Sequence, residues 1–264
     1  MIKVWAGPAK HDVRYIKRSL PSLLKSDLPE GTRIVLVDDQ STNEEVLRML
    51  RELPQKDPRV QVWRNPERMG PNTGQAYNFA KLVEHFPTAT VLVTCDDDVV
   101  YHPGWLQRLI QVYQEALDIG LEGVFTALNT PARPAFGERA LPTSQVILKQ
   151  RQMALNWMVP RAVYDKVGPF RDVGIAFDSD YCARMIELDL PVICLKPSYV
   201  QNIGYFGAYQ NSNALKAYDY VGRRDAYLLL RDLWFQFVNG LERLNESRFG
   251  EIVRPFFKWL LRRT

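Results

Sequence analysis

Three consecutive aspartates, Asp96, Asp97 and Asp98, follow an apolar segment that is typical of a buried strand, residues 90–95. A strand that ends in carboxylates places them in the crevice beyond the strand tips, where open α/β sheets bind ligands. Adjacent negative charges repel one another, and a divalent cation bound with a phosphate-bearing substrate would relieve that repulsion. Magnesium and manganese prefer such oxygen ligands. The alternative is a solvated acidic loop, which the abrupt end of so apolar a segment disfavours.

Two further acidic pairs occur in the chain. Asp38 and Asp39 end a second apolar segment, and Asp178 and Asp180 lie downstream. A carboxylate can hydrogen-bond a base or a ribose, hold a metal ion or accept a proton. Three such groups at one sheet edge would suit a nucleotide-diphosphate sugar. The Gly/Pro/Asn-rich segment 65–74 between them could present helix N-terminal amides to a phosphate or a sugar, although a plain strand–helix connection explains it equally well.

Apolar segments alternate with amphipathic helical patterns through residue 126. The expected strands cover 2–6, 33–37, 60–63 and 90–95, and the expected helices cover 13–24, 43–52, 74–86 and 105–117. Pro21 should kink the first helix or mark its end. Continuous apolar strands joined by helices imply a mostly parallel sheet covered on both faces. The predicted fold is therefore a doubly wound, Rossmann-like α/β sheet.

The regular alternation weakens after residue 128. The proline-containing segment 129–144 is expected to be a long mobile loop, and 156–159 and 192–195 are short strand candidates. From about residue 219 the pattern is helical. We therefore expect a main α/β domain over 1–215 and a C-terminal helical extension over 216–264.

Composition limits the classes of protein that fit. The 264 residues are 46% hydrophobic and 24% charged, as in ordinary globular proteins with a sizeable core. No run of 18 apolar residues predicts a membrane span, and the N-terminus lacks the apolar run of a signal peptide. Three cysteines without CxxC spacing indicate buried free thiols in a reducing compartment and disfavour a structural zinc site. We expect a cytoplasmic protein.

The net charge of +4 comes from the C-terminal region. Residues 220–264 hold nine Lys/Arg and five Asp/Glu, an excess of four, and the remaining 25 of each sign balance. No basic stripe interleaved with aromatic residues predicts nucleic-acid binding. The basic tail either packs on the sheet or lies on the inner, anionic face of a membrane as a peripheral contact.

Three segments, Val37–Thr42, Asn65–Asn78 and Asp96–Leu106, together resemble the N-terminal half of the family 2 glycosyltransferases, which have a GT-A fold. Residues 167–170 and 177–184 resemble the segment that carries the catalytic base of that family. The resemblance covers roughly residues 1–205. It implies a metal-dependent, inverting transferase that uses Mn²⁺ or Mg²⁺. The donor would be a nucleotide-diphosphate sugar, with a UDP-sugar favoured, and the acceptor a hydroxyl of a glycan or of a lipid-linked molecule, for example in surface polysaccharide or glycolipid synthesis.

The same resemblance implies roles for individual residues. Asp39 would contact the base, Asp96 or Asp97 the ribose, Asp98 the metal ion, and Asp178 would deprotonate the acceptor hydroxyl. Further nucleotide-binding positions would be Ala6, Pro8, Gly70 and Asn78.

The chain departs from the family pattern at two positions. Phe177 stands where the family often has Glu, so the neighbour that tunes Asp178 differs. Asn202 stands where the family often has a histidine metal ligand. Because an amide oxygen is a poorer ligand for manganese than an imidazole, metal would bind more weakly or only together with the donor.

Other functions fit parts of the pattern. Asp96-x-Asp98 after a strand also resembles the nucleophile motif of haloacid-dehalogenase-like phosphatases, but that motif usually stands near the start of its domain, and Asp38 and Asp39 would have no role. A non-catalytic nucleotide- or glycan-binding domain is a second alternative, supported only by Asn202. For Asp178 alone, the alternative to catalysis is a helix N-cap.

Overall fold

The computed structural model describes residues 1–4, 10–131, 133–204, 217 and 219–222. All of them belong to one compact unit, Met1–Gly222. The predicted helical extension, 216–264, falls almost entirely outside the described residues, and so does the proposed membrane contact of the tail.

Helices and strands alternate along the described part of the chain. Its helices are α1 (Lys10–Leu24), α2 (Glu44–Lys56), α3 (Pro71–His85), α4 (Trp105–Asp118), α5 (Arg161–Val167), α6 (Phe177–Glu187) and a 3₁₀ turn, η1 (Ala154–Asn156). The strands are β1 (Ile2–Val4), β2 (Ile34–Asp38), β3 (Val60–Arg64), β4 (Val91–Val93), β5 (Cys95–Asp96), β6 (Val99–Tyr101), β7 (Val124–Thr126), β8 (Ala135–Ala140), β9 (Gln145–Lys149), β10 (Trp157–Pro160), β11 (Val192–Lys196) and β12 (Val200–Asn202).

The strands form two main sheets that meet at the aspartate run. One sheet has the order β3-β2-β1-β5 and is parallel throughout. The other has the order β4-β10-β7-β11-β9-β8 and is mixed, with β7 and β11 parallel and β9 and β10 antiparallel to their neighbours. Only Thr94 separates β4 from β5, so one short stretch of chain joins both sheets.

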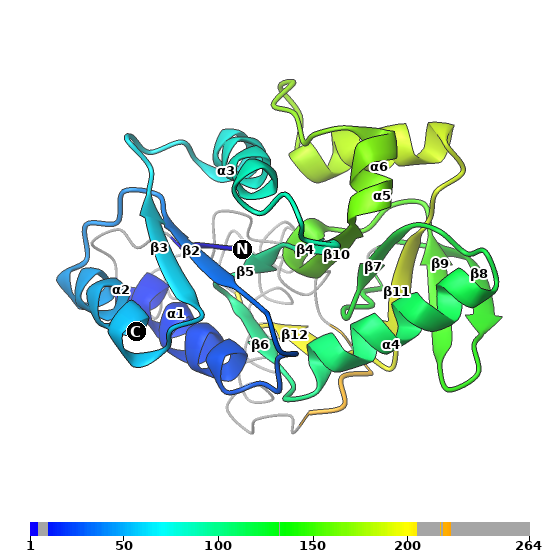
Figure 1. The fold of residues 1–264 in the computed structure, drawn as a ribbon, viewed down its shortest axis with the longest axis horizontal. Coiled ribbons are helices and arrows are strands. Elements are labelled where there is room, and N and C mark those ends of the chain that lie inside the picture. Colours follow the sequence, from blue (N-terminus) through cyan, green and yellow to red (C-terminus); the bar gives the residue numbers. More distant parts are fainter. Residues whose placement is uncertain (5–9, 132, 205–216, 218, 223–264) are drawn as a thin grey trace, which may run out of the picture. The chain divides into compact units, whose positions relative to one another are not determined.

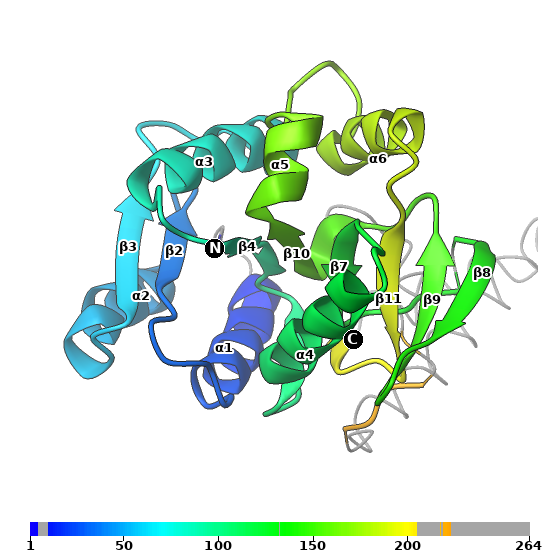
Figure 2. The same cartoon turned by 45° about the vertical axis from the view of Figure 1, so that its right-hand side comes forward.

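Helices cover both faces of the parallel sheet, because the side chains of β2 alternate between two cores. Ile34 and Leu36 pack in one apolar cluster with residues of α1, α2 and α4, whereas Val35 and Val37 pack in a second cluster with α3, α5 and α6. Figures 1 and 2 show α3 on one side of β2 and β3 and α1 and α2 on the other. The predicted doubly wound, largely parallel α/β fold is confirmed.

Local sequence signals account for some of the helix boundaries. The Asn43 side chain accepts from the amides of Glu45 and Val46 and caps α2. Pro71 occupies the first turn of α3, where its missing N–H costs no hydrogen bond. Pro21 lies inside α1, one turn before that helix ends, as the sequence indicated.

One prediction about the second half is wrong. The segment 129–144, expected to be a long loop, contains β8, which pairs with β9 as an antiparallel hairpin with an irregularity near Gly137. Most β8 side chains are exposed, so the segment lacks the apolar alternation that marks a half-buried strand.

The three cysteines, Cys95, Cys182 and Cys194, are free and buried, as predicted. Among the described residues, no helix is both long enough and apolar enough to cross a bilayer.

Candidate active site at the carboxyl edge of the sheet

Parallel pairing brings the acidic strand ends together. Strand β1 lies between β2 and β5, with Val4 in register with Asp38 and Lys3 in register with Asp96. Asp39 continues this pairing, since its amide donates to the Val4 carbonyl at 2.9 Å. The first two acidic clusters therefore flank the end of one central strand, which is the ligand position expected for an open α/β sheet.

Asp39 holds the 65–70 segment in place. Its side chain is 1% exposed. One carboxylate oxygen accepts from Asn65 Nδ2 at 2.7 Å and from the Met69 amide at 2.9 Å, and the other accepts from the Gly70 amide at 2.9 Å. The amides of Met69 and Gly70 are thus engaged by Asp39, and base recognition by this carboxylate stays a prediction.

Asp38, the neighbouring carboxylate, closes a turn. It accepts from the Ser41 amide at 2.8 Å and forms an ion pair with Arg64 at 2.5 Å. Arg64 also donates to Gln40, which has a positive φ of 64°. Asp38 therefore stabilises the turn that follows β2, and both of its carboxylate oxygens are used in doing so.

The aspartate run is electrostatically crowded. Burial and the adjacent charges of Asp98 and Asp97 raise the pKa of Asp96 well above its usual range, while Lys3 lowers it and Asp178 raises it further. Asp178 therefore lies close enough to the aspartate run to affect the pKa of Asp96. A crowded group of carboxylates of this kind favours a cationic ligand.

Asp98 lies against the last described strand, β12. Strand pairing places Asn202 opposite Val99, and the Ile203 amide donates to the Asp98 carbonyl at 2.7 Å. Burial raises the pKa of Asp98 to about 6, and the nearby Asn202 side chain opposes that shift. The structure thus brings together Asp98 and Asn202, the two predicted metal ligands.

Gly204 shapes the same corner. A Cβ atom at this position would lie 1.8 Å from Asp98 Oδ2 and 2.6 Å from Asp98 Cγ. Its amide donates to Asn202 Oδ1 at 2.9 Å, while Asn202 Nδ2 is buried and has no hydrogen-bond partner among the described residues. Only a residue without a side chain fits beside Asp98.

Asp178 stands in the first turn of α6, two residues after the N-cap position, Ala176. Its carboxylate accepts from the Ala154 amide at 3.4 Å. Burial raises the pKa of Asp178, against the opposing effects of the hydrogen bonds from Ala154 and Ser179 and of the Arg133 charge. Because Asp178 is not the N-cap residue, capping does not explain its presence. A carboxylate whose pKa is raised suits a general base.

Backbone contacts set the position of Asp178 relative to the aspartate run. Thr94 Oγ1, two residues before Asp96, donates to the Ala154 carbonyl at 3.0 Å and accepts from the Trp157 amide at 3.0 Å. Ala154 in turn donates to Asp178, so a single residue bridges the β4–β5 junction and the start of α6.

Four predicted nucleotide-binding residues remain, and the structure describes two of them, Asn78 and Asp97. Asn78 is buried in α3, where its Nδ2 donates to the Gly74 carbonyl at 2.6 Å and its Oδ1 has no partner among the described residues. Ala6 and Pro8 lie outside the described residues. Asp97 is half-buried beside Asp96.

Sequence reasoning missed Lys3 at this edge. Its Nζ donates to the Gly70 carbonyl at 2.6 Å, and Asp39, Asp96 and Asp97 lie close enough to affect its pKa. A lysine in a short first strand resembles any solvent-facing polar residue, and only the strand pairing shows that it lies among carboxylates.

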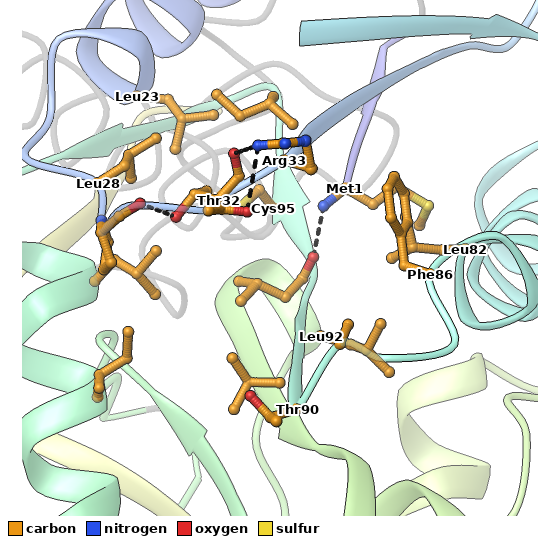
Figure 3. Close-up of a pocket in the computed structure, with 18 of the residues that line it drawn as sticks. Met1, Leu23, Leu28, Thr32, Arg33, Leu82, Phe86, Thr90, Leu92 and Cys95 are labelled. Carbon is orange, nitrogen blue, oxygen red and sulfur yellow. Dashed lines mark hydrogen bonds between the residues drawn. The ribbon is translucent and has the colours of Figure 1, made fainter. Parts of the chain in front are cut away.

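A cavity of about 590 Å³ lies elsewhere, lined by residues that include Met1, Ile34 and Val91 at the amino-terminal ends of their strands. Figure 3 shows Leu23, Leu28, Leu82, Phe86 and Leu92 around it. Its lining is mainly apolar and contains none of the acidic residues discussed above. It is therefore distinct from the candidate site.

The donor set at the acidic edge fits a hard divalent cation. Asp98 offers carboxylate oxygens and Asn202 an amide oxygen, and the absence of a side chain at Gly204 lets the Asp98 carboxylate occupy this corner. No three His, Cys, Asp or Glu side chains of the described residues converge into a ready-made metal cage. Two protein ligands suffice for Mg²⁺ or Mn²⁺ when substrate phosphates complete the coordination.

Residues 8–129 match the glycosyl transferase family 2. The chain carries a family 2 glycosyltransferase domain. The match contains Asp39, Gly70 and the aspartate run, and it ends before Asp178. It favours a glycosyltransferase over the phosphatase alternative.

Solved structures of three proteins share the fold. A mannosyltransferase, PcManGT from Pyrobaculum calidifontis, in complex with GDP-Man and Mn²⁺, is 16% identical with a TM-score of 0.51, over 74% of this chain and 55% of that one. GalNAc-T7 with UDP, GalNAc and Mn²⁺ is 14% identical with a TM-score of 0.58, over 80% and 45% of the two chains. TarS from S. aureus is 17% identical with a TM-score of 0.52, over 75% and 35%.

These likenesses establish a GT-A fold for the glycosyltransferase domain. The matched region spans about half or less of the length of each of these proteins. A comparison with curated proteins gives no significant match.

Proposed function

We propose that this glycosyltransferase is a metal-dependent, inverting enzyme that moves a sugar from a nucleotide-diphosphate donor to a hydroxyl acceptor. The observation that carries the proposal is the meeting of Asp96–Asp98 with Asp178 at the carboxyl edge of the sheet. Two of the similar structures hold GDP-Man or UDP together with Mn²⁺, which supports a nucleotide-sugar donor and that ion. We favour a UDP-sugar as the donor and Mn²⁺ or Mg²⁺ as the ion.

Each acidic residue then has one task. Asp178 accepts the proton of the acceptor hydroxyl as the oxygen attacks the anomeric carbon from the side opposite the leaving diphosphate. That attack forms the new C–O bond, breaks the bond to the diphosphate and inverts the anomeric centre. Asp96 and Asp97 orient the ribose, and Asp39 fixes the 65–70 segment against the donor.

Asp98 and Asn202 would hold the divalent ion. When bound, such an ion neutralises charge that develops on the departing diphosphate. Because Asn202 is an amide and not an imidazole, we expect metal to bind tightly only when the diphosphate is present.

A thermal-shift comparison tests the donor site. UDP, GDP, dTDP and CDP are each added with Mn²⁺ or with EDTA, and a ligand at about 100 times its Kd adds about 2.7 kcal/mol to stability. Stabilisation by one nucleotide with Mn²⁺ alone supports the proposal and names the base. Stabilisation that survives EDTA contradicts metal dependence, and no response to any of the four nucleotides overturns the donor assignment.

The base is tested by Asp178→Asn. General base catalysis typically contributes ~10²–10⁴-fold, so turnover of the donor should fall by about that factor while nucleotide affinity stays near that of the wild type. Asp118→Asn, at the end of α4, is the matched control and should preserve both quantities. Loss of nucleotide binding together with turnover in Asp178→Asn would contradict the base assignment.

We further propose a cytoplasmic location and a glycan or lipid-linked acceptor, with residues 216–264 as a separate helical extension. The basic sequence 255–263 supports contact with an anionic membrane surface. Sedimentation with anionic liposomes, with and without the last ten residues, tests that contact, and equal sedimentation of the two proteins would refute it.

A further inference from the structure

Lys3 places a fixed positive charge inside the acidic edge. It stands in β1, in register with Val37 on one side and Asp96 on the other. Burial lowers the pKa of the Lys3 ammonium, and the neighbouring carboxylates of Asp39, Asp96 and Asp97 oppose that shift. Lys3 is therefore part of the electrostatic structure of the site.

The Lys3 ammonium also clamps the start of α3. Gly70 has a positive φ of 71°, its amide donates to Asp39 at 2.9 Å, and its carbonyl accepts from Lys3 at 2.6 Å. Both polar groups of Gly70 are thus fixed by side chains from two adjacent strands. A Cβ atom at Gly74 would lie 3.5 Å from Lys3 Cδ, so the first turn of α3 covers the lysine stem.

The surroundings of Lys3 belong to one side of the site. Its ammonium hydrogen-bonds the Gly70 carbonyl, and Asp39, Asp96 and Asp97, which the proposed function assigns to the nucleoside, lie near enough to affect its pKa. Asp98, by contrast, lies against Gly204 in the segment that follows β12. The two ends of the aspartate run therefore face different structural elements.

We propose that Lys3 is a positioning residue for the nucleoside half of the donor site: its ammonium holds Gly70 and the carboxylates of Asp39 and Asp96 in the arrangement that binds base and ribose. The proposal rests on the proposed function, because it assumes a nucleotide donor. The proposal divides the donor site into two halves. The half that binds the nucleoside depends on Lys3, and the half that binds the metal ion and the diphosphate depends on Asp98.

The test measures nucleotide affinity by calorimetry for the wild type, Lys3→Met and Lys3→Gln. The probes are UDP and UMP, each with Mn²⁺ and with EDTA, or the corresponding pair if another diphosphate stabilises the wild type. Loss of a hydrogen bond from a charged group corresponds to about a 10-fold or larger change in Kd. We expect Lys3→Met to weaken the diphosphate and the monophosphate by the same factor, with and without metal.

Lys3→Gln keeps a donor for the Gly70 carbonyl but removes the charge, and it should recover part of the affinity. It also decides the question if Lys3→Met does not fold. The donor KM should rise with kcat changed much less, because Lys3 does not touch the reacting atoms. A purely structural role would lower stability without this division between KM and kcat.

Lys149→Met is the matched control. Lys149 is buried, whereas Lys3 is half-buried, and it too donates to a backbone carbonyl, that of Thr130, but it lies in β9. Its loss should reduce stability and leave nucleotide affinity unchanged.

Wild-type affinity in Lys3→Met would overturn the inference, and so would a loss confined to the diphosphate with metal, which would place Lys3 on the diphosphate. If the wild type itself binds none of the four nucleotides, the proposed function fails instead, which is a distinguishable result.

Discussion

Gly204→Ala tests the geometry of the metal corner by adding a single methyl group. The new Cβ would lie 1.8 Å from Asp98 Oδ2, whereas real Cβ atoms essentially never approach a heavy atom closer than 3.0 Å. The carboxylate or the 202–204 backbone must therefore move by at least 3.0 − 1.8, about 1.2 Å. A misplacement of about 1 Å in an active site can cost roughly 10²-fold in rate.

We expect Gly204→Ala to lose most of its Mn²⁺-dependent nucleotide binding and about 10²-fold in turnover. If the Asp98 side chain rotates away, stability should change little; if the backbone moves, overpacking should cost about 1–3 kcal/mol. Calorimetry with UDP and Mn²⁺, a donor-turnover assay and thermal unfolding separate these effects.

Gly104→Ala is the control for Gly204→Ala, because a Cβ atom there meets no heavy atom within 4 Å and Gly104 has an ordinary φ of −88°. It should behave as the wild type in all three measurements. Metal-dependent binding and turnover at wild-type levels in Gly204→Ala would refute the assignment of this corner to the metal ion.

Three further predictions concern the neighbourhood of Asp178. Arg171 and Arg184 form ion pairs with Asp180 and lower the pKa of its carboxyl group. The ionised carboxylate therefore stabilises the folded protein at pH values above the pKa of Asp180 in the unfolded chain. This stabilisation is lost as the pH falls through the lower pKa of Asp180 in the folded protein. Asp180→Asn should therefore lower the free energy of unfolding in urea by about 1.5–3 kcal/mol at pH 7 and by less at pH 3, and an equal loss at both pH values would contradict the ion pairs. Thr94→Val removes two buried hydrogen bonds and should lower the free energy of unfolding by about 1–3 kcal/mol, measured by thermal unfolding. Turnover should also fall, because the link from Thr94 through Ala154 to Asp178 is lost. Unchanged turnover would count against that link. Because burial raises the pKa of Asp178 and a general base must be deprotonated, turnover should begin to fall at a higher pH than for an ordinary aspartate, and the acidic limb of the rate profile should disappear in Asp178→Asn.

The sequence predicted the parallel sheet and its acidic edge because both depend on local patterns. Each apolar strand that ends in aspartate must deliver its carboxylates to the same edge once the strands are parallel, as Asp38 and Asp96 show on either side of β1. The hairpin strand β8 was missed because its side chains are mostly exposed, and strand formation there depends on pairing with β9.

Lys3 and Gly204 were missed for a different reason. Their importance comes from contacts with residues 67 and 106 positions away, Gly70 and Asp98, which no local pattern encodes. Asp98 and Asn202 could be assigned to the metal ion from the sequence, but Gly204 carried no signal beyond its place two residues after Asn202. Strand pairing had to be known before either residue could be given a role.

The tethers at the carboxyl edge suggest how the site keeps its shape before any ligand binds. Asp39 and Lys3 hold Gly70 from two strands, and Thr94 connects through Ala154 to Asp178. These contacts hold the loop and the helix start to the sheet, so the proposed base and ribose contacts need little rearrangement when the donor binds. At the metal corner, the Ile203 amide fixes the Asp98 backbone carbonyl, while the Asp98 carboxylate packs directly against Gly204 and lies near the Asn202 side chain. Because Asn202 offers an amide in place of an imidazole, we expect the ion to enter this corner together with the diphosphate, whose oxygens complete its coordination.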